Sequence, residues 1–306
     1  MAESRTVLIA GGSGMIGTAL SANLTAEGHN VHVLTRSTSA AEHDAHAHAW
    51  NPGVTELNLD DLAADIGSPI DVIVNLAGAS ISKMPWTRSY KELILSSRVS
   101  ATETLVHAIS SAKNKPSALI NGSAVGFYGN RADEELSETS PVGSGFLADV
   151  VQKWEEAASP ASSHVRVAYA RTGLVLGPKG ALVPLRLLTK LCVSGPLAGG
   201  KAWWPWISLR DEVRALAWLI THDISGPVNL VGPLPATSGE VGKSLAKRLK
   251  RPFWLPAPGF AIGLVLGEAG RELLLSSQKV VPTALEKSGF TFLDSTVDSA
   301  VASATN

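Results

Sequence analysis

The chain has 306 residues, of which 45% are hydrophobic and 17% charged, and it is long enough for one large α/β domain with a smaller companion. This composition excludes a disordered or highly charged protein. A formal net charge of −1 gives no electrostatic argument for a nucleic acid or an anionic membrane as a partner.

The expected location follows from cysteine content and from the apolar segments. Cys192 is the only cysteine, so an intramolecular disulfide is impossible and a reducing compartment is favoured. The first apolar stretch has the length of one strand and lacks the pattern of a signal peptide. The longest apolar segment elsewhere, residues 260–266, is too short to span a bilayer. We therefore expect a soluble, cytoplasmic protein without a membrane or nucleic-acid partner.

A glycine-rich turn follows the first apolar run, residues 7–10. Such a run is typical of a buried parallel strand, and a helix is expected from about position 14 to Gly28. The glycines fit two dinucleotide-binding spacings, Gly-x-x-Gly-x-x-Gly (11, 14, 17) and Gly-x-Gly-x-x-Gly (12, 14, 17). Without side chains, the turn and the helix N-terminus can approach a pyrophosphate. The predicted cofactor-binding residues here are Gly11, Gly12, Ser13, Gly14, Met15, Ile16 and Gly17.

The second strand, residues 31–34, leads to Arg36. In a dinucleotide-binding fold, the end of this strand meets the adenine ribose. An acid there binds the 2′-hydroxyl of NAD, whereas an arginine receives the 2′-phosphate of NADP. No acid occurs between residues 31 and 41, and Ser37 and Thr38 stand beside the arginine. NADP is therefore the predicted cofactor. The alternative is a solvated arginine at the end of a strand.

Three histidines, His43, His46 and His48, lie in an alanine-rich stretch. Their spacing suggests a metal site, but no cysteine or second group of ligands lies nearby. We interpret the stretch as a surface loop and predict no metal.

Strands and helices then alternate regularly. The strand predicted at residues 71–78 ends in Leu76, Ala77 and Gly78, and these three are predicted to contact the cofactor because Ala77 and Gly78 allow close backbone approach. The alternation predicts a parallel, doubly wound sheet of the α/β class. Further helices are expected at about 87–112 and 146–158, and further strands at 118–123 and 165–169.

Beyond Arg171 the pattern loosens. A helix is expected at 182–193, and the closely spaced Trp203, Trp204 and Trp206 fit a pocket wall or the core of a small domain better than a solvent-exposed surface. A helix at about 211–221 and a strand at 228–231 could return to the main sheet. The predicted domains are an NADP-binding domain at 1–172, completed by segments within 206–231, and a substrate-side region at 173–306 with a helical domain at about 237–306.

Together these residues resemble an extended short-chain dehydrogenase/reductase, the group that includes nucleotide-sugar epimerases. They are most similar to a poorly characterised "epimerase family" branch, sometimes labelled cell-division inhibitors, which has its own C-terminal domain. The resemblance implies a Rossmann fold and NADP, but no established substrate. It rests on the glycine turn, Arg36, 75–78, 96–99, 123–129, 154–155, 171–178, 206–211, 255–258, 267–268, 273–275 and 289–290.

Members of that superfamily use a tyrosine as general acid/base and a lysine four residues later that lowers the tyrosine pKa. This chain has three tyrosines, and none is followed by lysine at that spacing. On the helix that should carry the pair, Leu147 and Val151 occupy the two positions. The residues four positions after Tyr90, Tyr128 and Tyr169 are Ile94, Ala132 and Gly173.

Several residues remain as candidates for polar chemistry. Ser123 and Tyr128 are the predicted catalytic residues, with a backbone-bonded hydroxyl and a packed aromatic ring as the respective alternatives. Lys153 lies on the expected helix, but we expect it to pair with Asp149 one turn earlier. Arg98 is predicted among the cofactor-binding residues, and it could also bind an anionic substrate group or pair with an acid.

Two functions from different classes fit the sequence. The first is an NADP-dependent oxidoreductase or epimerase-like enzyme acting on a small polar substrate in a pocket at the carboxyl ends of the strands. The second is a catalytically silent NADP-binding sensor or regulatory protein. The sequence determines neither the substrate nor the oligomeric state.

Overall fold

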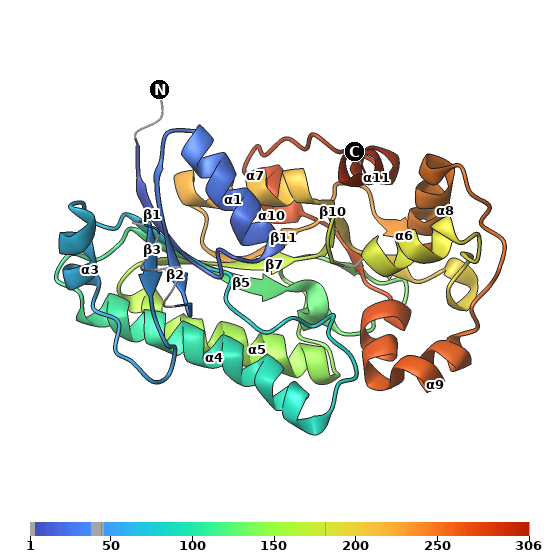
Figure 1. Ribbon diagram of the computed structural model, residues 1–306, viewed down its shortest axis with the longest axis horizontal. Helices are drawn as coiled ribbons and strands as arrows, with labels where there is room; N and C mark the ends of the chain where they lie inside the picture. The colour runs from blue at the N-terminus through green and yellow to red at the C-terminus, as the bar shows by residue number, and fades with distance from the viewer. Residues whose placement is uncertain (1–3, 38–43, 45, 181, 306) are drawn as a thin grey trace.

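The computed structural model describes residues 4–37, 44, 46–180 and 182–305. Within this part of the chain, seven parallel strands form one sheet in the order β11-β7-β5-β4-β1-β2-β3 (Figure 1). The predicted α/β class and doubly wound parallel sheet are confirmed. The strands are β1 (Thr6–Ala10), β2 (Asn30–Thr35), β3 (Ala47–Ala49), β4 (Val72–Asn75), β5 (Ala118–Ala124), β7 (Arg166–Thr172) and β11 (Gly226–Leu230).

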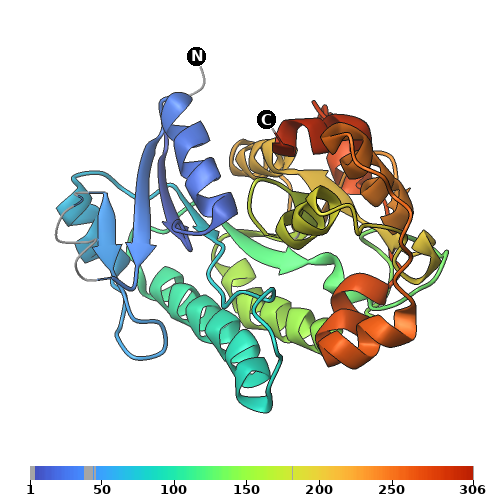
Figure 2. The same cartoon turned by 45° about the vertical axis from the view of Figure 1, so that its right-hand side comes forward.

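Helices cover both faces of this sheet. Alternate residues of a strand point to opposite faces. Val7 and Ile9 of β1 therefore pack with α1 and α7, whereas Leu8 and Ala10 pack with α3 and α4. Figure 2 shows the sheet between these two layers. The flanking helices are α1 (Met15–Ala26), α3 (Leu59–Ile66), α4 (Arg88–Ser111), α5 (Phe146–Ala158) and α7 (Leu209–Thr221).

The helix ends follow local sequence signals. Thr87, Ser208 and Asn58 precede α4, α7 and α3, and each side chain accepts a hydrogen bond from a first-turn N–H. Gly28 follows α1 with φ +88°, as expected for a glycine just past a helix end. The segment after α7 returns to the main sheet as β11, beside β7, in agreement with the prediction.

A second lobe adjoins the carboxyl ends of the strands (Figure 2). Its core contains the buried Trp204 and Trp206 with residues of α8 and α11, so these two belong to a small-domain core, whereas Trp203 is only half-buried. Its elements are α6 (Leu182–Lys190), α8 (Ser238–Leu249), α9 (Gly259–Gly270), the π-helical turn η4 (Arg271–Leu275), α11 (Val297–Thr305) and the strand pairs β8–β10 (Leu174–Leu176, Trp206–Ser208) and β9–β12 (Trp203–Trp204, Ala236–Thr237).

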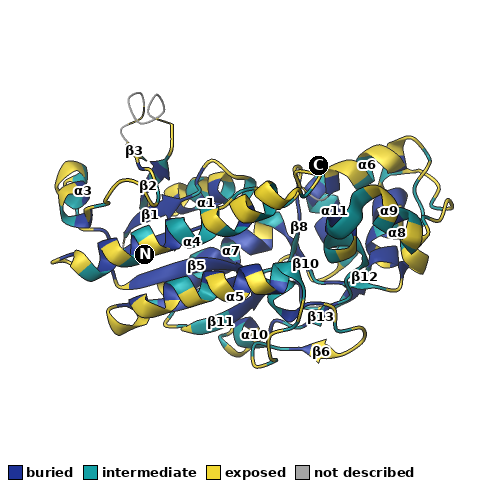
Figure 3. Cartoon of the chain, turned by 90° about the horizontal axis from the view of Figure 1, so that it is seen from below, coloured by how far each residue is buried: buried dark blue, intermediate teal, exposed yellow. Residues whose placement is uncertain are grey.

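The strand pair β6–β13 (Glu135–Leu136, Lys279–Val280) and the helix α10 (Thr283–Lys287) connect the C-terminal part of the chain to the main domain. The two short strands are parallel, and α10 packs beside β11. Figure 3 shows the resulting burial: the central strands of the main sheet are dark, and the outward sides of the helices are exposed.

Several sequence predictions were wrong in detail. The strand predicted at 71–78 ends at Asn75, so residues 76–78 form a loop, and the helix predicted at 182–193 ends at Lys190. Residues 47–49 form edge strand β3 and not a loop, with His48 close to His32. His43, the first of the three histidines, lies outside the described residues.

Candidate functional site

The glycine turn joins β1 to α1 at the point where the strand order reverses, between β1 and β4. Three of its glycines are restricted by packing. A Cβ at Gly12 would lie 2.5 Å from Val33 Cγ1. Gly11 has φ +86°, and a Cβ there would lie 2.5 Å from the carbonyl oxygen of Leu76. A Cβ at Gly17 would collide with the backbone of Gly11 and Gly12. These contacts hold the turn flat against the adjacent strand end and the first turn of α1.

Gly14 differs from its neighbours because the protein itself does not require a glycine there. Its backbone is extended, with φ −73°, and a Cβ would meet only the Gly11 oxygen at 3.4 Å, an ordinary contact. Gly14 is the N-cap of α1, and no side chain caps the helix. The N–H groups of the first turn thus face an exposed position where an anion can approach. Ser13 and Gly14 are exposed, and Met15 and Ile16 half-buried.

The end of β2 presents Arg36 to solvent. Its side chain makes no hydrogen bond or ion pair with any residue in the described ranges, which fits a group held ready for an external anion. Ser37 N–H donates to the Thr35 hydroxyl, so this strand end is locally ordered. Thr38, the other predicted helper, lies outside the described residues.

A buried polar network shapes the loop after β4. The Asn75 amide nitrogen donates to Asn121 (2.8 Å) and Thr102 (2.9 Å), and its oxygen accepts from the Ala77 N–H (3.2 Å). Trp154 donates to the same Thr102 hydroxyl. These contacts position Leu76 and Ala77 beside the glycine turn, and Gly78 follows them against Arg98. All three were predicted to meet the cofactor.

Arg98 lies beneath this loop. One guanidinium nitrogen, Nη1, donates to the carbonyl oxygens of Ala79 (3.0 Å) and Ile94 (2.9 Å), and the guanidinium stacks on Trp154. A Cβ at Gly78 would lie 3.0 Å from the Arg98 Cζ, so a larger residue there would require the guanidinium to shift. Desolvation lowers the Arg98 pKa to about 10. No carboxylate of the described residues pairs with Arg98, so the described part of the chain does not support the alternative of an ion pair with an acid.

Ser123 is engaged by the protein. Its hydroxyl donates to Glu155 Oε1 at 2.6 Å, and Arg171 binds both Glu155 oxygens, from Nε at 2.8 Å and from Nη2 at 2.9 Å. The predicted alternative was a bond to backbone, but the partner is a carboxylate on α5. Both charged groups are nearly buried, so the pair is well shielded from solvent.

Tyr128 is fully buried in the 3₁₀ turn η1 (Val125–Tyr128). Its hydroxyl donates to Asn229 Oδ1 (2.7 Å) and accepts from Arg171 Nη1 (3.0 Å). Burial raises the Tyr128 pKa, and the Arg171 cation opposes that effect. Ser123 and Tyr128 therefore belong to one network centred on Arg171. This arrangement favours the alternative of a packed aromatic ring, and the catalytic role of either residue stays a prediction.

The face of α5 that looks toward η1 is apolar. A Cβ at Gly126 would lie 3.2 Å from Leu147 Cβ and 3.8 Å from Val151 Cγ2, so these two side chains approach the turn after β5. The expected ion pair between Lys153 and Asp149 is wrong: both side chains are exposed and do not pair. The two residues lie four apart, but exposed side chains gain little from pairing.

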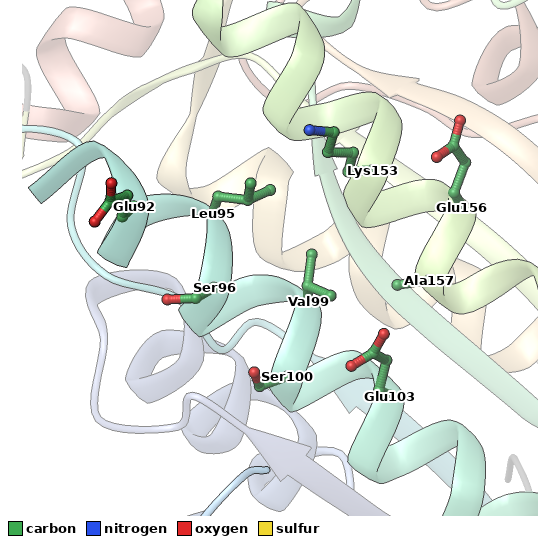
Figure 4. Close-up of a pocket in the computed structure, with 9 residues that line it drawn as sticks. All are labelled: Glu92, Leu95, Ser96, Val99, Ser100, Glu103, Lys153, Glu156 and Ala157. Carbon is green, nitrogen blue, oxygen red and sulfur yellow. The ribbon is translucent and has the colours of Figure 1, made fainter. Parts of the chain in front are cut away.

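Lys153 instead borders a shallow groove between α4 and α5 (Figure 4). The groove contains none of the predicted site residues, and we assign it no function. It is lined by Glu92, Leu95, Ser96, Val99, Ser100, Glu103, Lys153, Glu156 and Ala157.

Glu212 is a buried acid that sequence analysis missed. Its Oε1 accepts from the Thr172 hydroxyl at 2.8 Å, while Oε2 is buried without a partner among the described residues. Desolvation raises the Glu212 pKa to about 8. The sequence signal was weak, because an acid in the first turn of a helix is ordinarily a surface residue that favours the helix dipole.

Metal ligation finds no support in the described part of the chain, where no group of three or more His, Cys, Asp or Glu residues is arranged to hold an ion. The described helices also include none that is long and apolar enough to cross a membrane.

Comparison with known proteins accounts for this arrangement. A model of the NAD dependent epimerase/dehydratase family matches residues 7–232, and a domain of unknown function, DUF1731, matches residues 257–304. The chain belongs to this epimerase/dehydratase family. It is an extended short-chain dehydrogenase/reductase-type member with the additional C-terminal domain.

Similar epimerase/dehydratase family proteins match almost end to end. The epimerase family protein ML0860 of Mycobacterium leprae is 40% identical over 98% of this chain and 95% of its own. A chloroplastic SDR39U1 homolog of Arabidopsis thaliana is 36% identical over 94% of this chain and 83% of its own. A crystal structure of the human epimerase family protein SDR39U1 (isoform 2) with NADPH superposes with a TM-score of 0.87, at 30% identity, over 98% of both chains.

Proposed function

We propose that this epimerase/dehydratase family protein binds NADP(H) between the glycine turn, Arg36 and the loop after β4. The observation that carries the proposal is Gly14, a glycine at an exposed, uncapped helix N-terminus that neither backbone nor packing requires. A pyrophosphate at that position explains it. The uncompensated Arg36 favours the 2′-phosphate of NADP over NAD, and the NADPH in the human SDR39U1 structure supports the same cofactor.

The activity we propose is NADP-dependent oxidoreduction, or epimerase-like chemistry, on a small polar substrate in the cytoplasm. When bound, the cofactor supplies hydride transfer, and the protein supplies position and electrostatics. No tyrosine is followed by a lysine four residues later, and Leu147 and Val151 face the turn after β5. Proton transfer by the usual pair is therefore absent, and Ser123 or Tyr128 would have to leave the Arg171 network to take part.

A second candidate, a catalytically silent NADP sensor, is favoured by that network. The two predicted catalytic hydroxyls are both satisfied within the protein, and Tyr128 is fully buried. A sensor needs cofactor binding only, which the glycine turn provides. Neither candidate requires a nucleic-acid partner.

The decisive experiment combines cofactor titration with a search for turnover. NADPH fluorescence titration should give clearly tighter binding than NADH, and binding of neither would refute the whole proposal. Oxidation of NADPH should then be followed with sugars, quinones and aldehydes. Turnover that Ser123→Ala or Tyr128→Phe abolishes, in variants that still bind NADPH, would rule out the silent sensor. Its absence across the panel would count against the enzyme.

A further inference from the structure

The elements α6 and α9 and the segment 252–258 lie at one end of the molecule (Figures 1 and 2). Together they carry an exposed apolar surface. In α9, Phe260, Leu264 and Val265 are 80%, 84% and 79% exposed and lie on one side of the helix. We call the surface formed by Leu187, Leu191, Trp254, Phe260, Leu264 and Val265 the apolar end surface. Ten of the sixteen large hydrophobic side chains that are exposed in the described chain occur in α6, its C-terminal extension, 254–255 or α9, so the exposure is clustered.

Hydrogen bonds make this surface continuous. Trp254 Nε1 donates to the Cys192 carbonyl at 3.0 Å, and Leu255 N–H donates to the Ser194 carbonyl at 3.2 Å. Leu197 and Ala257 form a β-bridge, which leads directly to the start of α9. The exposed side chains are therefore presented by a fixed backbone and not by separate loose loops.

The unpaired charges in the segments that carry this surface are basic. Residues 182–198 and 241–267 contain no aspartate or glutamate, although the whole chain has a net charge of −1. Lys190, Lys250 and Arg251 are exposed and adjoin Leu191 and the segment 252–258 in sequence, while Lys247 is paired with Asp298. At the start of α9, no charged residue interrupts the apolar helix until Glu268, which pairs with Lys91.

Exposed tryptophan, phenylalanine and leucine beside lysine and arginine are the chemistry of an interfacial helix on an anionic lipid bilayer. A two-fold contact between two copies of this surface would set its lysines and arginines against one another, and such like-charge contacts are unfavourable. We infer that the apolar end surface docks the protein peripherally on an anionic membrane. This departs from the expectation drawn from net charge, because the average over the chain hides the local excess of positive charge.

The test is co-sedimentation of the full chain with vesicles of phosphatidylcholine, alone or with about 30% phosphatidylglycerol. Binding is expected to the anionic vesicles and should fall as salt is raised. Phe260→Glu/Leu264→Glu should weaken it at least about tenfold, since each carboxylate would have to enter the interface. Lys250→Glu/Arg251→Glu should weaken it severalfold. The matched control, Val54→Glu/Leu293→Glu, alters exposed apolar residues elsewhere and should bind as the parent does.

Three outcomes would overturn the inference. One is no binding to the anionic vesicles, and another is equal binding to neutral ones. The third is a dimer in light scattering that Phe260→Glu/Leu264→Glu converts to monomer without any vesicle binding, which would assign the surface to a second copy. Thermal melting of each variant, with and without NADPH, separates lost docking from lost folding.

Discussion

Ser123 Oγ and Glu155 Oε1 lie 2.6 Å apart, and Arg171 donates hydrogen bonds to both oxygens of the same carboxylate. This relationship joins the end of β5 to α5 and β7 and fixes the turn that carries Tyr128. Breaking a buried ion pair by removing one charge leaves the other uncompensated. The network is thus a structural centre of the domain, whatever chemistry occurs beside it.

Glu155→Gln should lower the free energy of unfolding by about 3 kcal/mol, because Arg171 would keep its buried charge without a counter-ion. The control is Glu156→Gln, the next residue on α5, which is exposed and should change stability by less than about 0.5 kcal/mol. Urea denaturation of both variants measures the difference. Equal stabilities would show that the pair contributes little.

The glycine turn predicts opposite behaviour for two alanine substitutions. Gly14→Ala should leave the melting temperature of the cofactor-free protein unchanged and weaken NADPH binding about tenfold or more, because its methyl group has room in the protein but not beside a pyrophosphate. Gly17→Ala should destabilise by about 1–3 kcal/mol, because its methyl group meets the backbone of Gly11. Titration and thermal melting test both. A Gly14→Ala protein with parental NADPH affinity would remove the main support for the proposed site.

The sequence was sufficient to predict the glycine turn because its signal is local: a buried strand, four glycines and a helix follow one another within about a dozen residues. The same is true of α4, whose cap Thr87 is adjacent in sequence. Helix α3 has comparable local signals, the cap Asn58 before it and Gly67 with φ +75° after it, although the sequence analysis did not predict this helix.

The orientation of the catalytic candidates could not be predicted in this way. Adjacent residues of a strand point to opposite faces, so a shift of one position along β5 would turn the Ser123 side chain to the other face and to a different partner. Its partner Glu155 is 32 residues away, and the Tyr128 partner Asn229 is 101 residues away. Likewise, His48 lies in a strand because residues 47–49 pair with β2, and no local pattern of these three residues predicts that pairing.

Arg36→Asp should reverse the cofactor preference from NADP to NAD. The introduced carboxylate would repel the 2′-phosphate and accept a hydrogen bond from the 2′-hydroxyl of NAD. Arg88→Asp removes another exposed arginine and serves as the control for net charge. The ratio of the two dissociation constants is the measurement. An unchanged ratio would mean that Arg36 does not contact the phosphate.

Arg98→Met should separate stability from cofactor binding. The guanidinium is desolvated and lacks a carboxylate partner in the described chain, so the neutral variant should be as stable as the parent or more stable. NADPH binding should nevertheless weaken about tenfold, because a positive charge near the anionic cofactor is lost. Arg98→Lys keeps the charge and should recover part of the affinity. Loss of stability in parallel with affinity would indicate only a structural clamp on the loop after β4.

Glu212 makes stability depend on pH in a defined direction. Its pKa is raised from 4.5 to about 8 in the folded chain, so above pH 4.5 the unfolded chain releases a proton that the folded chain retains. The free energy of unfolding is therefore undiminished by Glu212 below the unfolded pKa of 4.5. It falls as the pH rises toward 8, by up to about 1.4 kcal/mol per pH unit.

Glu212→Gln should therefore flatten this decline in the free energy of unfolding between about pH 5 and 8 and stabilise the protein most at the alkaline end. Urea unfolding at several pH values, with Glu156→Gln as the exposed control, measures the slope. If the parent and Glu212→Gln share one slope, Glu212 is ionised in the folded protein.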